Sequence, residues 1–232
     1  MKYQALAADF DGTLATGGKV AAETVAALER LRASGRKLIL VTGRHLEDLR
    51  HIFPQMLQFE WVIAENGALL YRPSRGEMQT LGEPPPEKFL QTLSARGVPF
   101  KAGHVMVNTH TPYDQVVLEI IHELELDWRV IYNKGAVMVL PSGIDKSGAL
   151  KKVLQELSVT RHELITVGDA ENDLDFLDLG ALAVAVENAL PALKEKADWV
   201  TSQPAGAGVV EFIDRLLESD PESRPNLPEP KE

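Results

Sequence analysis

The sequence contains no cysteine among its 232 residues, which excludes a disulfide framework and thiolate chemistry. It also lacks a run of about 18 apolar residues, the length that crosses a bilayer, and a hydrophobic stretch of signal-peptide length near its start. Basic residues are outnumbered by acidic ones, 24 to 34, so the formal net charge is −10. These absences predict a cytoplasmic protein without membrane contact, and they disfavour nucleic-acid binding through a basic face.

Hydrophobic residues make up 44% of the chain and charged residues 25%, values typical of a globular protein with a full core. In two regions, roughly residues 3–72 and 141–217, apolar runs of strand length alternate with amphipathic helical patterns. Apolar runs without polar alternation indicate a parallel sheet that is covered on both faces. The prediction is an α/β fold with a Rossmann-like, doubly wound parallel sheet.

Residues 73–86 interrupt this pattern with four prolines and two glycines. The following segment has helical patterns at 87–96 and 113–126 and a hairpin signal at 133–135, which favour a small α+β unit. The predicted organisation is a core of residues 1–76 and 141–218 with an α+β cap at 77–140. A proline-rich, disordered tail is expected at 219–232.

Two carboxylates, Asp9 and Asp11, stand at the end of the first apolar run, with Gly12 after them. Carboxylates that lie close together repel each other and are costly to remove from water. This position therefore predicts either a bound cation or a carboxylate that acts as a reagent. One residue between the two lets both face a ligand as the strand unwinds, and the glycine eases that turn.

Three more polar signals stand at strand ends or helix starts, namely Thr42-Gly43-Arg44, Lys146 and the acidic stretch 168–173. Taken singly, each is explained by an ordinary turn, a solvated lysine or a solvated acidic face. The carboxyl ends of parallel strands meet at one edge, where open α/β sheets bind ligands. The four signals together therefore predict a single site.

"DFDGTL", the Thr-Gly-Arg, the lysine that opens a helix, and "GDAEND" resemble the four motifs of the haloacid dehalogenase superfamily. More narrowly, they resemble its Cof-like Mg-dependent phosphatases, which include archaeal-type phosphoglycolate phosphatases and sucrose-phosphatase relatives. "AENGA" at 64–68 and the segment 197–213 are similar to that subgroup too. The resemblance covers residues 1–72 and 141–217 and implies a cap after the third core strand.

The resemblance implies that Mg²⁺ is held by the Asp9 carboxylate, the backbone carbonyl of Asp11 and the Asp169 carboxylate. Asp9 would attack phosphorus to give an aspartyl-phosphate, and Asp11 would serve as general acid and then general base. Thr42 and Lys146 would hold the phosphate oxygens. Asn172 and Asp173 would orient the metal ligands and the lysine; the substrate-binding candidates are Thr42, Gly43, Arg44, Asn66 and Lys146.

Other polar positions are less well defined. Glu187 stands where relatives commonly have glycine, and an added carboxylate there would alter the charge near the site. The four histidines on expected helices or loops, His45, His51, His122 and His162, are expected at the surface. The cap offers a further set, undecided between substrate contact and surface: Lys101, His104, Asn108, His110 and Lys134.

The expected function is Mg-dependent hydrolysis of a small phosphomonoester, either phosphoglycolate or a sugar phosphate, because a closed cap excludes large substrates. Two alternatives stay open: a phosphomutase or phosphotransferase with the same intermediate, and a non-catalytic divalent-cation-binding protein. An EF-hand loop is disfavoured because Leu174 and Gly180 occupy its glycine and glutamate positions. A monomer or homodimer is expected, and the sequence does not select the substrate.

Overall fold

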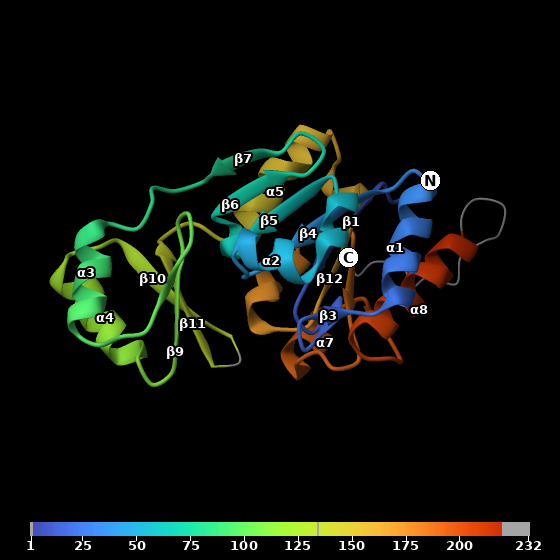
Figure 1. Ribbon diagram of the computed structural model, residues 1–232. Helices are drawn as coiled ribbons and strands as arrows, with labels where there is room; N and C mark the ends of the chain where they lie inside the picture. The colour runs from blue at the N-terminus through green and yellow to red at the C-terminus, as the bar shows by residue number, and fades with distance from the viewer. Residues whose placement is uncertain (1, 134, 220–232) are drawn as a thin grey trace.

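The computed structural model describes residues 2–133 and 135–219. The expected proline-rich tail therefore lies, from residue 220 on, outside the described residues. Figure 1 shows a large α/β body at one end of the molecule and a smaller unit at the other. We call the large body the core and residues 87–141 the insert. Within the described residues, no helix has the length and apolar character needed to cross a membrane.

Within the described residues, the core contains an eight-stranded sheet in the order β14-β13-β12-β1-β4-β5-β6-β7. Its strands are β1 (Ala5–Asp9), β4 (Lys37–Val41), β5 (Trp61–Ala64), β6 (Leu69–Arg72), β7 (Glu77–Thr80), β12 (Leu164–Gly168), β13 (Leu182–Ala185) and β14 (Trp199–Val200). Neighbouring strands are parallel from β14 to β5, and β6 and β7 are antiparallel. The predicted α/β fold is confirmed, with a mixed sheet in place of a purely parallel one.

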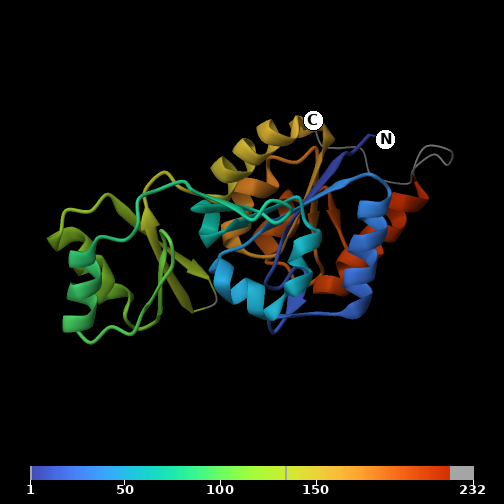
Figure 2. The same ribbon diagram turned by 45° about the horizontal axis from the view of Figure 1, so that its top comes forward.

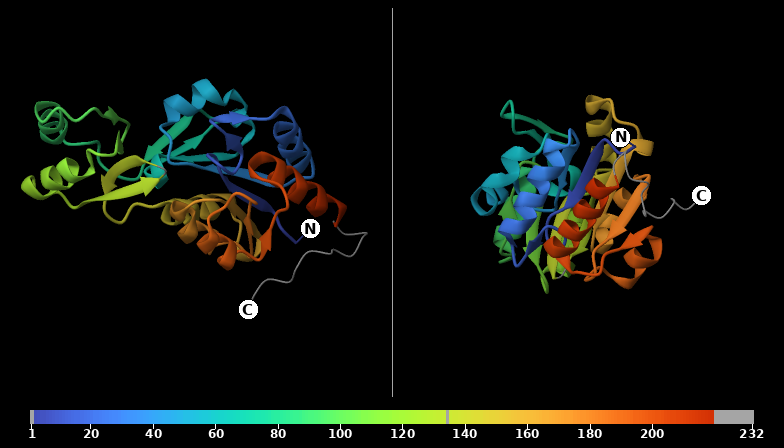
Figure 3. Two further views of the ribbon diagram at one scale, coloured as in Figure 1. Left: turned by 90° about the horizontal axis from the view of Figure 1, so that it is seen from below. Right: turned by 90° about the vertical axis from the view of Figure 1, so that its right-hand side faces the viewer.

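Helices cover both faces of this sheet, as the end view in Figure 3 shows. The hydrophobic cluster on one face takes side chains from α1 (Ala22–Ala33), α2 (Leu46–Ile52), α7 (Pro191–Lys196) and α8 (Ala205–Glu218). The other face is covered by α5 (Lys146–Leu157) and α6 (Leu174–Leu177). Because both faces are buried, every residue of β1 and β12 is apolar or small except the last residue of β1, Asp9, and Thr166.

Short elements complete the core. The hairpin of β2 (Ala15–Thr16) and β3 (Lys19–Val20) follows β1. The 3-10 turns in the described part of the chain are η1 (Pro54–Gln58), η2 (Glu65–Gly67), η3 (Arg161–Glu163) and η4 (Glu171–Asp173). Helix α5 begins at Lys146, as expected for a lysine that opens a helix, and Asp145 caps it by accepting a hydrogen bond from the Gly148 N–H at 2.6 Å.

The boundary predicted at residue 77 needs correction. Residues 77–80 form β7, which pairs with β6 at the edge of the core sheet, so the core sheet continues to Thr80. All four residues of β7 are exposed, and their sequence therefore carries no hydrophobic alternation. The turn at 73–76, between β6 and β7, is the start of the proline- and glycine-containing segment 73–86 that interrupts the pattern in the sequence.

The insert has its own antiparallel sheet in the order β10-β11-β9-β8. Its elements are α3 (Glu87–Ala95), β8 (Lys101–Ala102), β9 (Val107–His110), α4 (Asp114–Glu123), β10 (Trp128–Asn133) and β11 (Ala136–Pro141). One sheet face packs on α3 and α4 through Val107, Val137 and Val139. Strand alternation turns the other face, with Asn108 and Met138, toward the core. Figure 2 shows the two chain segments that join the insert to the core.

Candidate active site

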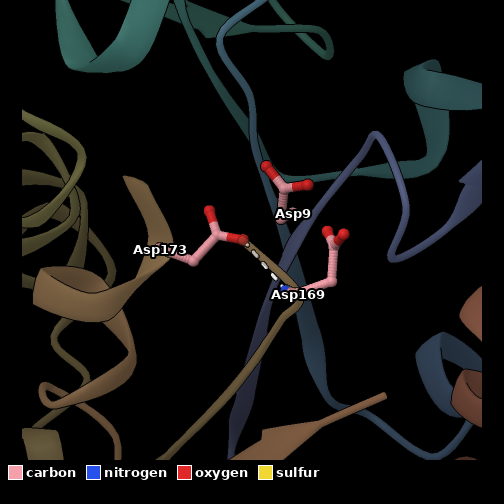
Figure 4. Close-up of side chains that lie close together, drawn as sticks. All are labelled: Asp9, Asp169 and Asp173. Atoms are coloured by element: carbon pink, nitrogen blue, oxygen red, sulfur yellow. Dashed lines mark hydrogen bonds between the residues drawn. The ribbon is translucent and has the colours of Figure 1, made fainter. Parts of the chain in front are cut away.

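The center of the core sheet brings together segments that are far apart in the sequence. Strand β1 lies between β4 and β12, so Asp9, Thr42 and Asp169 stand at the carboxyl ends of three adjacent strands. Among the described residues, Asp9, Asp169 and Asp173 form a buried group with ligand atoms within 4.8 Å of one another. Figure 4 shows that Asp9 comes from β1, that Asp169 and Asp173 come from the segment that follows β12, and that the three carboxylates lie close together.

Lys146 bridges two members of this acidic group, Asp9 and Asp173. Its Nζ donates to Asp9 Oδ1 and to Asp173 Oδ1, both at 2.7 Å, and the lysine side chain is 2% exposed. Burial alone would lower the pKa of Lys146, but the charges and hydrogen bonds of the two aspartates raise it above its ordinary value. The lysine therefore stays charged and fixes the orientation of the Asp9 carboxylate.

Both carboxylate oxygens of Asp173 have partners within the protein. Its Oδ2 accepts from the backbone N–H groups of Asp169 and Ala170, both at 3.0 Å, while Oδ1 accepts from Lys146. Figure 4 marks the bond to the Asp169 backbone. With these contacts, Asp173 positions the lysine and the loop after β12, and Asp9 and Asp169 are left as the better candidates for metal ligands.

Gly12 is the residue that allows the first motif to approach Asp169. Its φ is +94°, and a Cβ there would lie 2.2 Å from Asp169 Oδ2. Thr13, a motif residue with no role predicted from the sequence, donates from Oγ1 to Asp169 Oδ1 at 3.0 Å. The Asp-x-Asp-Gly-Thr turn is therefore wrapped around the Asp169 carboxylate.

The charges of this site favour a divalent cation. Burial, followed by the charge of Asp173, raises the pKa of Asp9 well above its ordinary value, although Lys146 opposes this effect. Asp169 adds to it. Three buried carboxylates facing one ammonium leave an excess of negative charge, and hard oxygen ligands are what Mg²⁺ prefers. The donor set thus fits the expected magnesium site.

Asp11 has a different surrounding from Asp9. Arg44 donates from Nε to Asp11 Oδ2 at 2.6 Å and from Nη2 to Oδ1 at 2.7 Å. About a third of each side chain is exposed. The sequence places Asp11 and Arg44 at the same site without predicting this two-pronged ion pair.

Thr42 is buried at the end of β4, where its Oγ1 accepts from the Arg44 N–H at 3.1 Å. Gly43 follows, and a Cβ there would lie 3.1 Å from Met138 Sδ of the insert. Asn66 donates to the same sulfur at 2.8 Å and accepts from Asn172 Nδ2 at 3.3 Å. Asn66 and Asn172 therefore lie beside the Lys146 end of the site and away from Asp11.

A second constellation, absent from the sequence-based prediction, joins the core to the insert. Glu65 is fully buried, and its carboxylate accepts from the backbone N–H groups of His104, Val105 and Met106 at 2.9–3.0 Å. Burial alone would raise the pKa of Glu65, but the nearby His45 ring and the three N–H groups lower it to about 2. The core thus holds the insert through a charged group.

His45 contradicts its expected surface position, because it is only 4% exposed. Its Nδ1 lies 3.6 Å from Glu65 Oε1, beyond normal hydrogen-bond length. A Cβ on Gly103 would lie 2.2 Å from that nitrogen, so this glycine lets the insert close over the ring. The sequence feature that could have predicted a buried position for His45 is its place directly after Thr42-Gly43-Arg44, at the start of α2.

Comparison with known proteins agrees with this geometry. A family model described as haloacid dehalogenase-like hydrolase matches residues 6–100 and 78–213. The chain belongs to the haloacid dehalogenase-like hydrolase family. The family membership predicted from the four motifs is therefore confirmed, and with it the prediction of an enzyme of this hydrolase family.

Named relatives of this family match over nearly the whole chain. Phosphoglycolate phosphatase 2 of Saccharolobus solfataricus is 30% identical, with 91% of each chain covered. Phosphoglycolate phosphatase of Methanothermobacter thermautotrophicus is 28% identical, over 92% of this chain and 99% of that protein. A haloacid dehalogenase-like hydrolase structure from Bacteroides thetaiotaomicron has a TM-score of 0.81 at 20% identity, over 93% of this chain and all of that one. The structural likeness extends to the insert as well as the core.

One more residue of this hydrolase site was missed by the sequence analysis. Asn188 donates from Nδ2 to the Gly12 carbonyl at 2.9 Å and accepts from the Ala205 N–H at 2.6 Å. It thereby ties the turn after β1 to the start of α8. Its neighbour Glu187, the departure from relatives, is exposed, and its N–H donates to the Gln203 carbonyl.

Proposed function

We propose that this protein is a Mg²⁺-dependent phosphatase that hydrolyses a small phosphomonoester, phosphoglycolate or a sugar phosphate, through an aspartyl-phosphate. The observation that carries the proposal is the buried Asp9 carboxylate, fixed by Lys146 and placed beside Asp169. The names of the two relatives support the reaction class. The insert acts as a cap over the site.

The first step joins Asp9 to phosphorus. Asp9 Oδ1 is held by Lys146, so its other oxygen attacks the phosphoryl group while the bond to the alcohol oxygen breaks. Thr42 and Lys146 donate to phosphate oxygens, where charge gathers. Mg²⁺ bound by the Asp9 and Asp169 carboxylates and the Asp11 carbonyl would neutralise the phosphate charge and orient it for attack.

Asp11 moves the protons. To protonate the leaving alcohol oxygen it must exchange its two Arg44 contacts for a proton and the substrate, and its partial exposure leaves room for this change. In the second step Asp11 takes a proton from water, the resulting hydroxide attacks phosphorus, and the bond to Asp9 breaks. The products are the alcohol and inorganic phosphate.

Phosphate release from p-nitrophenyl phosphate tests the proposal. We expect turnover with Mg²⁺, loss of turnover in EDTA, and recovery when Mg²⁺ is returned. Asp9→Asn should abolish turnover while the thermal melt stays cooperative. Asp214→Asn, at an exposed carboxylate paired with Arg30, is the matched control and should retain full activity. Turnover that persists in Asp9→Asn would remove Asp9 from the nucleophile role.

A further inference from the structure

A cavity of about 350 Å³ lies between the core and the insert and opens on the site. Asp9, Asp11 and Arg44 line it from the core, and the insert contributes Asn108 and Asn133. A substrate with its phosphate on Asp9 would therefore extend its alcohol portion toward the insert. Nothing in the roles assigned above recognises that portion of the molecule.

The insert sheet brings its two asparagines to the same face. Asn108 in β9 pairs with Met138 in β11, and Asn133 in β10 pairs with Ala136, two residues before Met138 on the same strand. Residues two apart on a strand point to the same face of a sheet. The strand period and the register therefore bring both amides to the cavity, although they are 25 residues apart in the sequence.

Polar atoms around this cavity have no partner among the described residues. The atoms without a hydrogen bond are the Oδ1 of Asn108, the Oδ1 of Asn133 and the Nε2 of His45, whereas His45 Nδ1 faces the Glu65 carboxylate. Buried polar groups without hydrogen bonds are costly, and native proteins satisfy nearly all of them. Three such side chains on one cavity, at the leaving-group side of a catalytic carboxylate, indicate a site that a ligand completes.

The charge of the lining limits which ligand fits. Asp9, Asp11 and Asp48 contribute three carboxylates, whereas Arg44 is the one permanent cation among the described lining residues and is already bound to Asp11. Even if Arg44 leaves Asp11 during proton transfer, the described lining offers a second anion on the substrate this one permanent cation against three carboxylates. A hydroxyl group, by contrast, donates to an amide oxygen and accepts from a ring N–H, whereas a carboxylate can only accept.

We propose that His45, Asn108 and Asn133 bind the leaving group of the substrate, and that this leaving group is a small alcohol with additional hydroxyl groups. The inference rests on the proposed phosphatase function and narrows it from two substrate classes to the polyhydroxylated one. These three residues determine specificity, whereas Asp9 and Asp11 of the core attack phosphorus and transfer the protons.

The substrate preference of the wild-type protein is the first test. Glycerol phosphate and hexose 6-phosphates represent hydroxylated leaving groups, phosphoglycolate a carboxylate, and p-nitrophenyl phosphate neither. We expect kcat/KM for the best hydroxylated substrate to exceed that for phosphoglycolate by about tenfold or more. A preference for phosphoglycolate would overturn the inference. Absence of turnover with every one of these esters would contradict the proposed function itself.

Variants locate the preference on the three side chains. Asn108→Leu, Asn133→Leu and His45→Phe should each lower the ratio of kcat/KM for the hydroxylated substrate to that for p-nitrophenyl phosphate by about 10- to 100-fold. His122→Phe, at an exposed position on α4, should leave that ratio unchanged. An unchanged ratio in both asparagine variants would overturn the assignment even if His45→Phe failed to fold.

Discussion

The core edge and the insert face meet at one cavity but differ in how their polar groups are satisfied. At the core edge, Lys146 and Asp173 use their polar atoms on partners within the protein. On the insert face, the Oδ1 atoms of Asn108 and Asn133 have no partner among the described residues. Under the proposed function, this difference means that Asp9 and Lys146 are held in place before the substrate arrives, whereas the insert face completes its hydrogen bonds with the substrate.

Lys146→Met should have the largest effect on stability and turnover, because it removes the cation that Asp9 and Asp173 share at the core edge. Asp9 and Asp173 would then be buried without their shared partner, which costs about 3–5 kcal/mol of unfolding free energy. We expect turnover of p-nitrophenyl phosphate to fall by at least about 10³-fold. Urea unfolding and steady-state kinetics measure the two effects.

Lys196→Met is the matched control, since Lys196 forms an exposed pair with Asp178. Such a pair contributes about 1 kcal/mol or less. If Lys146→Met were as stable and active as Lys196→Met, the core edge would not depend on its internal partners as described.

Gly12→Ala should have an intermediate effect. The new Cβ meets Asp169 Oδ2, and alanine at a φ of +94° is strained, which together cost about 1–3 kcal/mol. We expect weaker Mg²⁺ binding, seen as a smaller thermal shift on adding Mg²⁺, and turnover lowered by about 10- to 100-fold. Gly35→Ala has a similar positive φ but no neighbouring atom within 4 Å. A magnesium response as large in Gly12→Ala as in Gly35→Ala would argue against Asp169 as a ligand.

Glu65→Gln should have the smallest effect on turnover, because Glu65 lies at the contact between the core and the insert. The pKa of Glu65 is about 2 in the folded protein and 4.5 ordinarily, so its ionised form contributes about 3 kcal/mol of stability at neutral pH. Because the folded pKa is the lower one, this contribution is present above pH 4.5 and is lost as the pH falls from 4.5 to 2. Thermal melts across this window should therefore show a steeper loss of stability in the wild type than in Glu65→Gln. Parallel curves would contradict the role of the Glu65 charge.

Much of the core edge was predictable because its signals are local. The apolar runs of β1, β4 and β12 end at Asp9, Thr42 and Asp169, and parallel strands bring such ends together whatever the details of packing. Family resemblance then supplied a role for Lys146, which the structure places on Asp9.

The features that escaped prediction depend on contacts between distant segments. His45 is buried where Gly103 of the insert approaches its ring closely, and Glu65 binds backbone N–H groups, which leave no side-chain signal. Strand β7 is exposed along its whole length, so no hydrophobic pattern marks it. Asn188 contacts Gly12 from the opposite half of the chain.

Covalent trapping tests the central claim most directly. The wild-type protein, mixed with a phosphate ester labelled on phosphorus and stopped with acid within one turnover, should yield a labelled peptide that contains Asp9. Tandem mass spectrometry should place the phosphoryl group on that carboxylate, and Asp11→Asn should form the label but turn it over more slowly. Label on another residue, or turnover without any labelled peptide, would contradict the account of Asp9 as the nucleophile.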